Sequence, residues 1–200
     1  MRAEHRREQL LDVTKQIVGE QGFHAVSIEA VARRAGVSRP IVYAHFGDLA
    51  GLLEAMVARE AARAIGQLTE VLPRELERDD PLEALLAALR AYLETVRADP
   101  VTWRLALMPP EGAPVVLRED IERGRAAIVG LLAEFVGPGL VAGAGSPDPE
   151  LTARTLSALS DESARLLLTD PERYPIERLM AHAQWLLKLA RPVGAPESSG

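Results

Sequence analysis

The 200-residue chain contains no cysteine, which excludes disulfide bonds and cysteine-ligated zinc. Aromatic residues make up only 4% of it, so leucine, alanine and valine must fill the interior. No uncharged apolar run reaches the ~18 residues that a membrane span needs. The first residues, MRAEHRREQL, also lack the apolar run of a signal peptide. We therefore expect a soluble, cytoplasmic protein of one or two domains, with no membrane partner.

Motifs of catalysis are lacking as well. The four histidines form no HExxH or HxxxH pair, and the chain contains neither GxSxG nor a P-loop. The glycines at 137, 139, 143 and 145 give GxGxxxG, which misses the dinucleotide-binding spacing and follows no predicted strand. The sequence therefore predicts no catalytic residue, no metal site and no cofactor, and an enzyme is a disfavoured alternative.

The charge is unevenly distributed along the chain. Acids outnumber bases by 29 to 23, and the net charge of −6 argues at first against a nucleic-acid partner. Residues 1–47 hold seven bases against five acids, a net +2, which leaves −8 for the remainder. Screening confines the acidic field to about 8–10 Å, so the basic N-terminal part could still bind phosphates. Charge alone does not separate this interpretation from an ordinary solvated surface.

Residues Ser27–Phe46, SIEAVARRAGVSRPIVYAHF, have the pattern of two short helices joined by a tight turn. Ser27 can cap the first helix, because its side-chain oxygen can accept from the free N–H groups of the first turn. Gly36 stands at the reversal, where glycine accepts a left-handed backbone. Ser38 is a second candidate cap, and Pro40 suits the first turn of the next helix, where its missing N–H has no partner. This layout is typical of a helix-turn-helix, whose second helix enters the DNA major groove.

These residues resemble the TetR family of transcriptional regulators over roughly residues 3 to 55. The resemblance is carried by Gln21-Gly22-Phe23, Ala35-Gly36-Val37-Ser38, Tyr43-Ala44-His45-Phe46 and Leu52-Leu53. It implies an all-α fold of about nine helices: an N-terminal three-helix bundle, a long connecting helix and a C-terminal ligand-binding and dimerisation domain. It also implies a double-stranded DNA operator, a homodimer and an unidentified small-molecule effector as partners. Repression is the family's common output.

Helical periodicity extends this organisation along the chain. We expect a first helix over about 3–21 and a long helix from Asp48 that Pro73 breaks. Further helices are expected to begin at Pro81, at Pro100, near Leu117, at Asp148 and at Pro175. The predicted domains are 1–47 for DNA binding and 48–191 for ligand binding and dimerisation, followed by a disordered tail, 192–200.

The resemblance implies that outward positions of the motif meet DNA: Ser27, Ser38, Arg39, Pro40, Ile41, Tyr43, Ala44 and His45. Arg39 is the best candidate for reading a base, because a guanidinium can donate twice to guanine O6 and N7. Tyr43 and His45 are expected to contact phosphates, although His45 could equally be structural. Glu29 would either repel phosphate or accept from a cytosine amino group. An arginine here could also be simply solvated.

Two positions depart from the family pattern. Leu49 stands where the family often has a lysine, so a phosphate contact is either missing or supplied from elsewhere. Pro40 stands where the family often has glycine, which the first turn of a helix tolerates. The departure at Leu49 keeps one alternative open, a helical interaction protein that has lost DNA binding.

The C-terminal part offers two candidate surfaces. An inducer pocket is expected among the middle helices, with candidate residues Leu89, Tyr92, Leu93, Trp103, Leu107, Met108, Ile128 and Glu162. Each of these could instead fill the core. A dimer interface on the last two helices is implied by the resemblance, with candidate residues Leu156, Leu159, Ser160, Ser163, Leu167, Leu179, Ala183 and Leu186. An ordinary intramolecular core is the alternative there.

Overall fold

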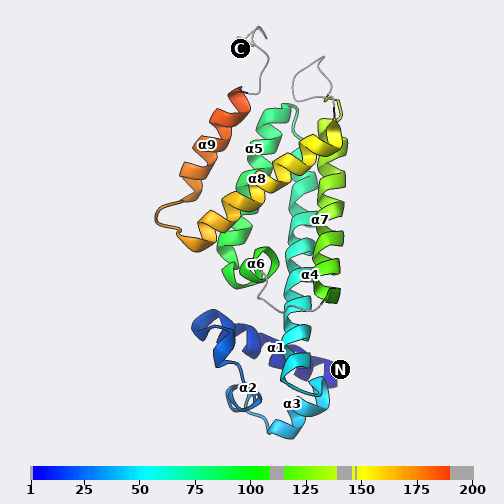
Figure 1. The fold of residues 1–200 in the computed structure, drawn as a ribbon, viewed down its shortest axis with the longest axis vertical. Coiled ribbons are helices and arrows are strands. Elements are labelled where there is room, and N and C mark those ends of the chain that lie inside the picture. Colours follow the sequence, from blue (N-terminus) through cyan, green and yellow to red (C-terminus); the bar gives the residue numbers. More distant parts are fainter. Residues whose placement is uncertain (1, 109–114, 139–145, 147, 190–200) are drawn as a thin grey trace. The chain divides into compact units, whose positions relative to one another are not determined.

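The computed structural model describes residues 2–108, 115–138, 146 and 148–189 (Figure 1). Within these residues the chain forms nine α-helices and one 3-10 helix, with no strand, as the all-α prediction required. The predicted tail 192–200 lies outside the described residues. No single helix of the described part is long and apolar enough to cross a membrane. Only α3 and α4 taken together meet that criterion, and they are bent by 63°.

The chain divides into two compact units, which do not coincide with the predicted functional division. One unit comprises Met1–Ala64 and Val101–Glu122, and the other comprises Ile65–Pro100 and Arg123–Gly200. The functional boundaries at 47 and 191 therefore stay a prediction. Two helices, α4 (Leu49–Leu76) and α7 (Val115–Val136), contribute residues to both units.

The first unit contains the helix-turn-helix. The two helices of this motif are α2 (Ile28–Ala35) and α3 (Arg39–Phe46). The other elements of the unit are α1 (Arg2–Gln21), η1 (Phe23–Ala25), α6 (Pro100–Leu107) and the first parts of α4 and α7. The apolar stripes of these helices close on one core, whose fully buried members include Leu10, Val31, Val42, Leu52 and Met56. Their three- and four-residue spacing is what the sequence pattern predicted.

Local residues set the ends of the motif helices. Ser27 caps α2 by accepting from the Ala30 N–H at 3.1 Å. Gly36 takes a left-handed backbone with φ of 68°, which a residue with a Cβ would adopt only under strain. Ser38 stands at the N-cap of α3 but its side chain makes no capping hydrogen bond, so that part of the prediction is wrong. Asp48, as predicted, accepts from the Gly51 N–H at 2.8 Å and caps α4.

The prediction that Pro73 breaks the long helix is also wrong. Proline removes one backbone hydrogen bond and crowds the preceding turn, yet α4 continues through it to Leu76. Leu72 and Leu76, on either side of it, are buried in the second unit. The burial of these two leucines stabilises the last turn against the local preference of the proline.

The second unit is formed by α5 (Pro81–Ala98), α8 (Pro149–Thr169), α9 (Ile176–Leu189) and the remaining parts of α4 and α7. Helix α5 packs against both α8 and α9 (Figure 1). Capping by Asp80 and Asp148 begins α5 and α8, as their positions before Pro81 and Pro149 suggest. The core of this unit is built from leucine, isoleucine, valine and alanine.

Candidate nucleic-acid interface and ligand cavity

Helix α3 presents most of the predicted DNA-binding residues to solvent. Arg39, Pro40, Ile41, Tyr43 and Ala44 are exposed, with Ile41 and Tyr43 at 38% and 50% of their accessible surface. Ser38 is exposed as well, whereas Ser27 and His45 are half-buried. On the opposite side of α3, Val42 is wholly buried. The helix therefore has one face fixed in the core and one face available to a partner.

Side chains of α1 hold the C-terminal ends of the two motif helices. The Arg7 guanidinium donates to the His45 carbonyl at 3.4 Å and lies 4.6 Å from the centre of the Phe46 ring. The Gln9 amide donates to the Ala35 carbonyl at 3.2 Å. These carbonyls belong to the last turns of α3 and α2, where a cation or an N–H donor is favourable. The contacts fix the orientation of both motif helices on α1.

An open groove runs between α2 and α3 on the exposed side. It is lined by Glu29, Ala32, Arg33, Val37, Ser38, Arg39, Pro40 and Tyr43. Across it, Arg39 Nη1 lies 2.7 Å from Glu29 Oε1, and both side chains are about three-fifths exposed. The sequence named both residues but not their ion pair. Their position at the starts of two consecutive motif helices was the available signal.

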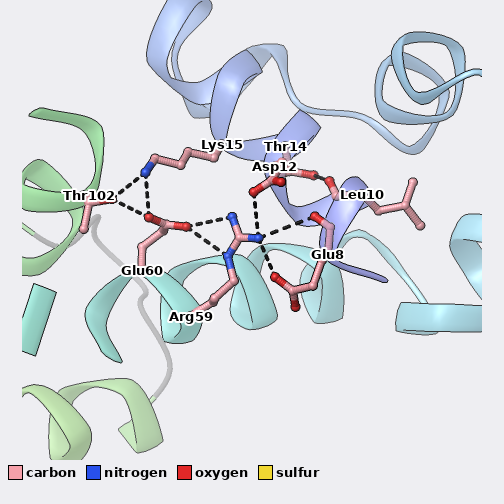
Figure 2. A network of polar contacts seen from close by, with 8 residues as sticks. All are labelled: Glu8, Leu10, Asp12, Thr14, Lys15, Arg59, Glu60 and Thr102. Atoms are coloured by element: carbon pink, nitrogen blue, oxygen red, sulfur yellow. Dashed lines mark hydrogen bonds and ion pairs between the residues drawn. The ribbon is translucent and has the colours of Figure 1, made fainter. Parts of the chain in front are cut away.

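A buried polar network joins α1, α4 and α6 within the first unit (Figure 2). Glu60 is fully buried, and Lys15 Nζ lies 2.8 Å from its Oε2. Thr102 donates to the same oxygen, and Arg59 lies 2.7 Å from Oε1. Arg59 also pairs with Glu8. No sequence motif indicates this network, although Glu60 lies one turn from Met56, on the buried side of α4.

The surroundings of Glu60 act on its pKa in opposite directions. Burial alone would raise the pKa of this carboxyl, because a charge is poorly solvated there. Hydrogen bonds from Lys15, Thr102 and Arg59 outweigh burial and leave the pKa below its ordinary value. Glu60 is therefore ionised at neutral pH, and among the described residues it belongs to no metal-binding cluster.

A cavity of about 290 Å³ lies within the second unit, lined by residues of α4, α5, α7, α8 and α9. Most of its wall is leucine. Four residues predicted for the inducer pocket line it: Leu89, Tyr92, Ile128 and Glu162. The other four, Leu93, Trp103, Leu107 and Met108, do not.

Those four residues lie elsewhere for different reasons. Leu93 is wholly buried on another side of α5. Trp103 and Leu107 belong to α6, which is part of the first unit. Met108 follows α6 and is 39% exposed. Periodicity identified apolar positions correctly but did not tell which of them face a common void.

The buried hydroxyl of Tyr92 interrupts the apolar wall of the cavity. The Tyr92 hydroxyl donates to Asp161 Oδ1 at 3.2 Å, and Arg125 Nη2 lies 2.8 Å from Oδ2. Burial, followed by the negative charge of Asp161, raises the pKa of Tyr92 well above its ordinary value. Tyr92 therefore remains a neutral hydroxyl, and Asp161 is held in place by two partners.

The predicted dimer residues lie largely around the same cavity. Of the eight, all but Leu167 line it. Leu167 and Leu179 are already buried in the protomer, which supports the intramolecular role for these two. The exposed large apolar side chains of α8 and α9 are Leu151, Leu159 and Trp185. Trp185, stacked on His182 with ring centres 5.5 Å apart, was not among the predicted residues.

Comparisons with known proteins agree with this architecture. The sequence profile described as "Bacterial regulatory proteins, tetR family" matches residues 10–56. The HTH-type transcriptional regulator BetI of Serratia proteamaculans is 31% identical over 161 residues, which are 78% of this chain and 77% of BetI. The HTH-type transcriptional activator FasR of Mycolicibacterium smegmatis is 29% identical over 102 residues, 51% of this chain and 45% of FasR. The chain thus spans less than half of FasR.

Solved structures give the same result at the level of the fold. A transcriptional regulator from Rhodococcus sp. Rha1 superposes with a TM-score of 0.68 at 25% identity, covering 92% of this chain and 94% of that one. FadR from Bacillus subtilis, solved in complex with stearoyl-CoA, superposes with a TM-score of 0.65 at 17% identity, covering 90% and 96%. From the BetI similarity and the exposed helix-turn-helix together, the chain belongs to the TetR family of transcriptional regulators, which are ligand-responsive DNA-binding proteins.

Proposed function

We propose that this regulator is a homodimeric repressor that a small molecule releases from its DNA operator. The observation that carries the proposal is the exposed face of α3, held on a fixed scaffold with Arg39 at its N-terminal end. In helix-turn-helix proteins the N-terminal residues of the second helix contact base edges. Bacterial DNA lies in the cytoplasm, so the protein would act there.

The exposed residues suit distinct roles on DNA. Arg39 would donate to guanine O6 and N7. Tyr43 and His45 would donate to phosphates, which fixes the register without reading sequence. Ser27 and Ser38, at helix N-termini, would do the same. Three residues of α3 would make apolar contact with a thymine methyl: Pro40, Ile41 and Ala44.

Two copies are needed because one motif reads only a few base pairs. A symmetric dimer places two recognition helices in successive major grooves, about 34–36 Å apart. We place the dimer contact on α8 and α9, where Leu159 and Trp185 expose half or more of their surface. Exposed large apolar side chains grouped on two helices favour a protein partner over solvent.

The effector would bind the leucine-rich cavity of the second unit. Its size is at the lower limit of ordinary ligand pockets, so a small apolar molecule fits best. Tyr92 and Asp161 would give such a molecule a polar contact. Moving the protein from mostly bound to mostly released requires differential affinity of about 5 kcal/mol between two conformations. Helix α4, which contributes to both units, would carry that change.

The leucine at position 49 does not support the alternative of a helical interaction protein that has lost DNA binding. Leu49 is half-buried and packs against the core of the first unit, so its replacement of a lysine is accommodated structurally. The relatives are regulators, and the sequence contains no HExxH, GxSxG or P-loop motif, so we propose no catalytic activity.

Mobility shift on the DNA that flanks the chain's own gene tests the proposal. The wild-type protein should retard one fragment specifically, and Arg39→Ala should abolish that shift while dimer mass and helicity stay unchanged. A fragment bound equally well by Arg39→Ala would refute the role of Arg39. Absence of any specific fragment, even in a genome-wide selection, would refute DNA binding itself.

A further inference from the structure

The ion pair between Glu29 and Arg39 joins the beginnings of the two motif helices. Glu29 lies in the first turn of α2, and Arg39 is the first residue of α3. We propose that Glu29 is a specificity-determining residue, which holds the Arg39 guanidinium in position for guanine and keeps it from binding phosphates. This inference rests on the proposed DNA-binding function.

The backbone that carries the pair is fixed. Between the two helices the chain turns at Gly36, whose N–H is bonded to the end of α2. Ala32 is buried and Val37 packs against the same core, so both walls of the groove are anchored. The separation of the two carrier helices therefore does not depend on the ion pair, and Glu29 acts on the Arg39 side chain alone.

The geometry leaves Arg39 able to read a base. The pair joins Nη1 to Glu29 Oε1 at 2.7 Å. A guanidinium has five N–H donors in a rigid planar fork, so one contact on Nη1 leaves donors on Nη2 and Nε for the two acceptors of guanine. A long arginine side chain otherwise loses much of its rotamer freedom when it is fixed. Because Glu29 holds the Arg39 side chain before DNA binds, part of this entropy loss is no longer incurred on binding.

The pair does not contribute much to the stability of the fold. Both side chains are about three-fifths exposed, and solvent and salt screen the attraction of an ion pair at such a position. Its position on the DNA-facing side gives it another effect. A carboxylate there is repelled by every phosphate, whatever the sequence, and it neutralises the cation that would otherwise neutralise a phosphate. Glu29 should therefore weaken binding to random DNA more than binding to the operator.

A comparison of three variants tests the role of Glu29. Glu29→Ala removes the pair, and Arg39→Ala removes the reader. Glu20→Ala is the matched control, because Glu20 of α1 forms an exposed ion pair at 2.5 Å with Arg34 of α2 in the same unit. It removes the same charge and frees one arginine too. Each full-length protein is used to select from a randomised duplex library, and its affinity for the selected site and for random DNA is measured from 50 to 200 mM salt.

We expect the wild type to select a guanine that Arg39→Ala no longer selects. Glu29→Ala should bind random DNA about tenfold more tightly, lose most of that guanine preference, and show a steeper salt dependence by about one phosphate contact, a slope change of ~0.9. Glu20→Ala should keep the guanine preference unchanged. A Glu29→Ala protein with the wild-type preference and salt slope would overturn the inference while leaving the proposed function intact.

Two other outcomes of the selection would overturn the inference in different ways. Loss of a cytosine preference in Glu29→Ala, with the guanine contacted by Arg39 retained, would overturn the inference, since Glu29 would then read a base itself. A wild-type protein that selects no sequence at all would overturn the proposed function, and the inference with it.

Discussion

Lys15 of α1 and Glu60 of α4 form an ion pair of 2.8 Å in which the glutamate side chain is fully buried and the lysine is 16% exposed. A buried carboxylate is unfavourable unless several donors surround it. Lys15, Arg59 and Thr102 supply those donors from three different helices. The pair therefore ties α1 to α4 and α6 inside the unit that carries the helix-turn-helix.

Glu60→Gln should lower the free energy of unfolding by about 3 kcal/mol, because it leaves Lys15 and Arg59 without a buried counter-ion. Glu8→Gln is the control: it removes an exposed partner of the same Arg59, and should cost less than about 1 kcal/mol. Urea unfolding followed by helicity measures both. Equal losses in the two variants would contradict the buried character of the network.

The stabilisation by Glu60 should disappear in acid. Its pKa is lowered in the folded state, so the stabilisation is complete above the ordinary value of 4.5 and is lost as the pH falls through the folded-state value. The difference in unfolding free energy between wild type and Glu60→Gln should accordingly be full at pH 7 and shrink below pH 4.5. A difference that grows with acidification would mean that the network does not favour the ionised carboxyl.

The two N-cap serines of the motif should respond differently to alanine. Ser27→Ala removes the bond to the Ala30 N–H and should destabilise the protein by about 1 kcal/mol. Ser38 makes no capping hydrogen bond, so Ser38→Ala should change stability by less than half of that. Thermal unfolding of both variants in parallel measures the two changes in stability. A larger loss for Ser38→Ala would contradict the capping geometry.

Filling the cavity should block the response to an effector without affecting DNA binding. Leu89→Trp places a larger side chain into the lining, whereas Met108→Trp adds the same group outside it. A panel of small apolar compounds is first screened for one that raises the melting temperature of the wild type and releases its DNA. That compound should still act on Met108→Trp and lose its effect on Leu89→Trp. A retained effect in Leu89→Trp would place the ligand elsewhere.

Local features of this fold could be predicted from the sequence, and long-range ones could not. The cap at Ser27 and the turn at Gly36 depend on a few neighbouring residues, and both were predicted correctly. Pro73 was misjudged, because burial of its neighbours in the second unit opposes its local preference. Glu60 was missed, since two of its three partners, Lys15 and Thr102, lie more than 40 residues away in the sequence.

In the candidate DNA-binding and ligand sites, too, local features could be predicted from the sequence and long-range ones could not. The helical phase that buries Val42 predicts the exposure of Pro40 and Ala44 on the opposite side of α3. The pairing of Arg39 with Glu29 depends on the angle between α2 and α3, which the sequence pattern does not give. For the cavity, periodicity identified apolar residues of α5 without telling Leu89, which lines it, from Leu93, which does not.

Hydroxyl-radical footprinting of the wild-type protein on its selected operator shows whether two α3 helices of a dimer bind neighbouring major grooves through Arg39. We expect two protected segments related by two-fold symmetry, with centres one helical turn (about 34–36 Å) apart, and loss of both in Arg39→Ala. A single protected segment, or the same footprint in Arg39→Ala, would contradict this expectation.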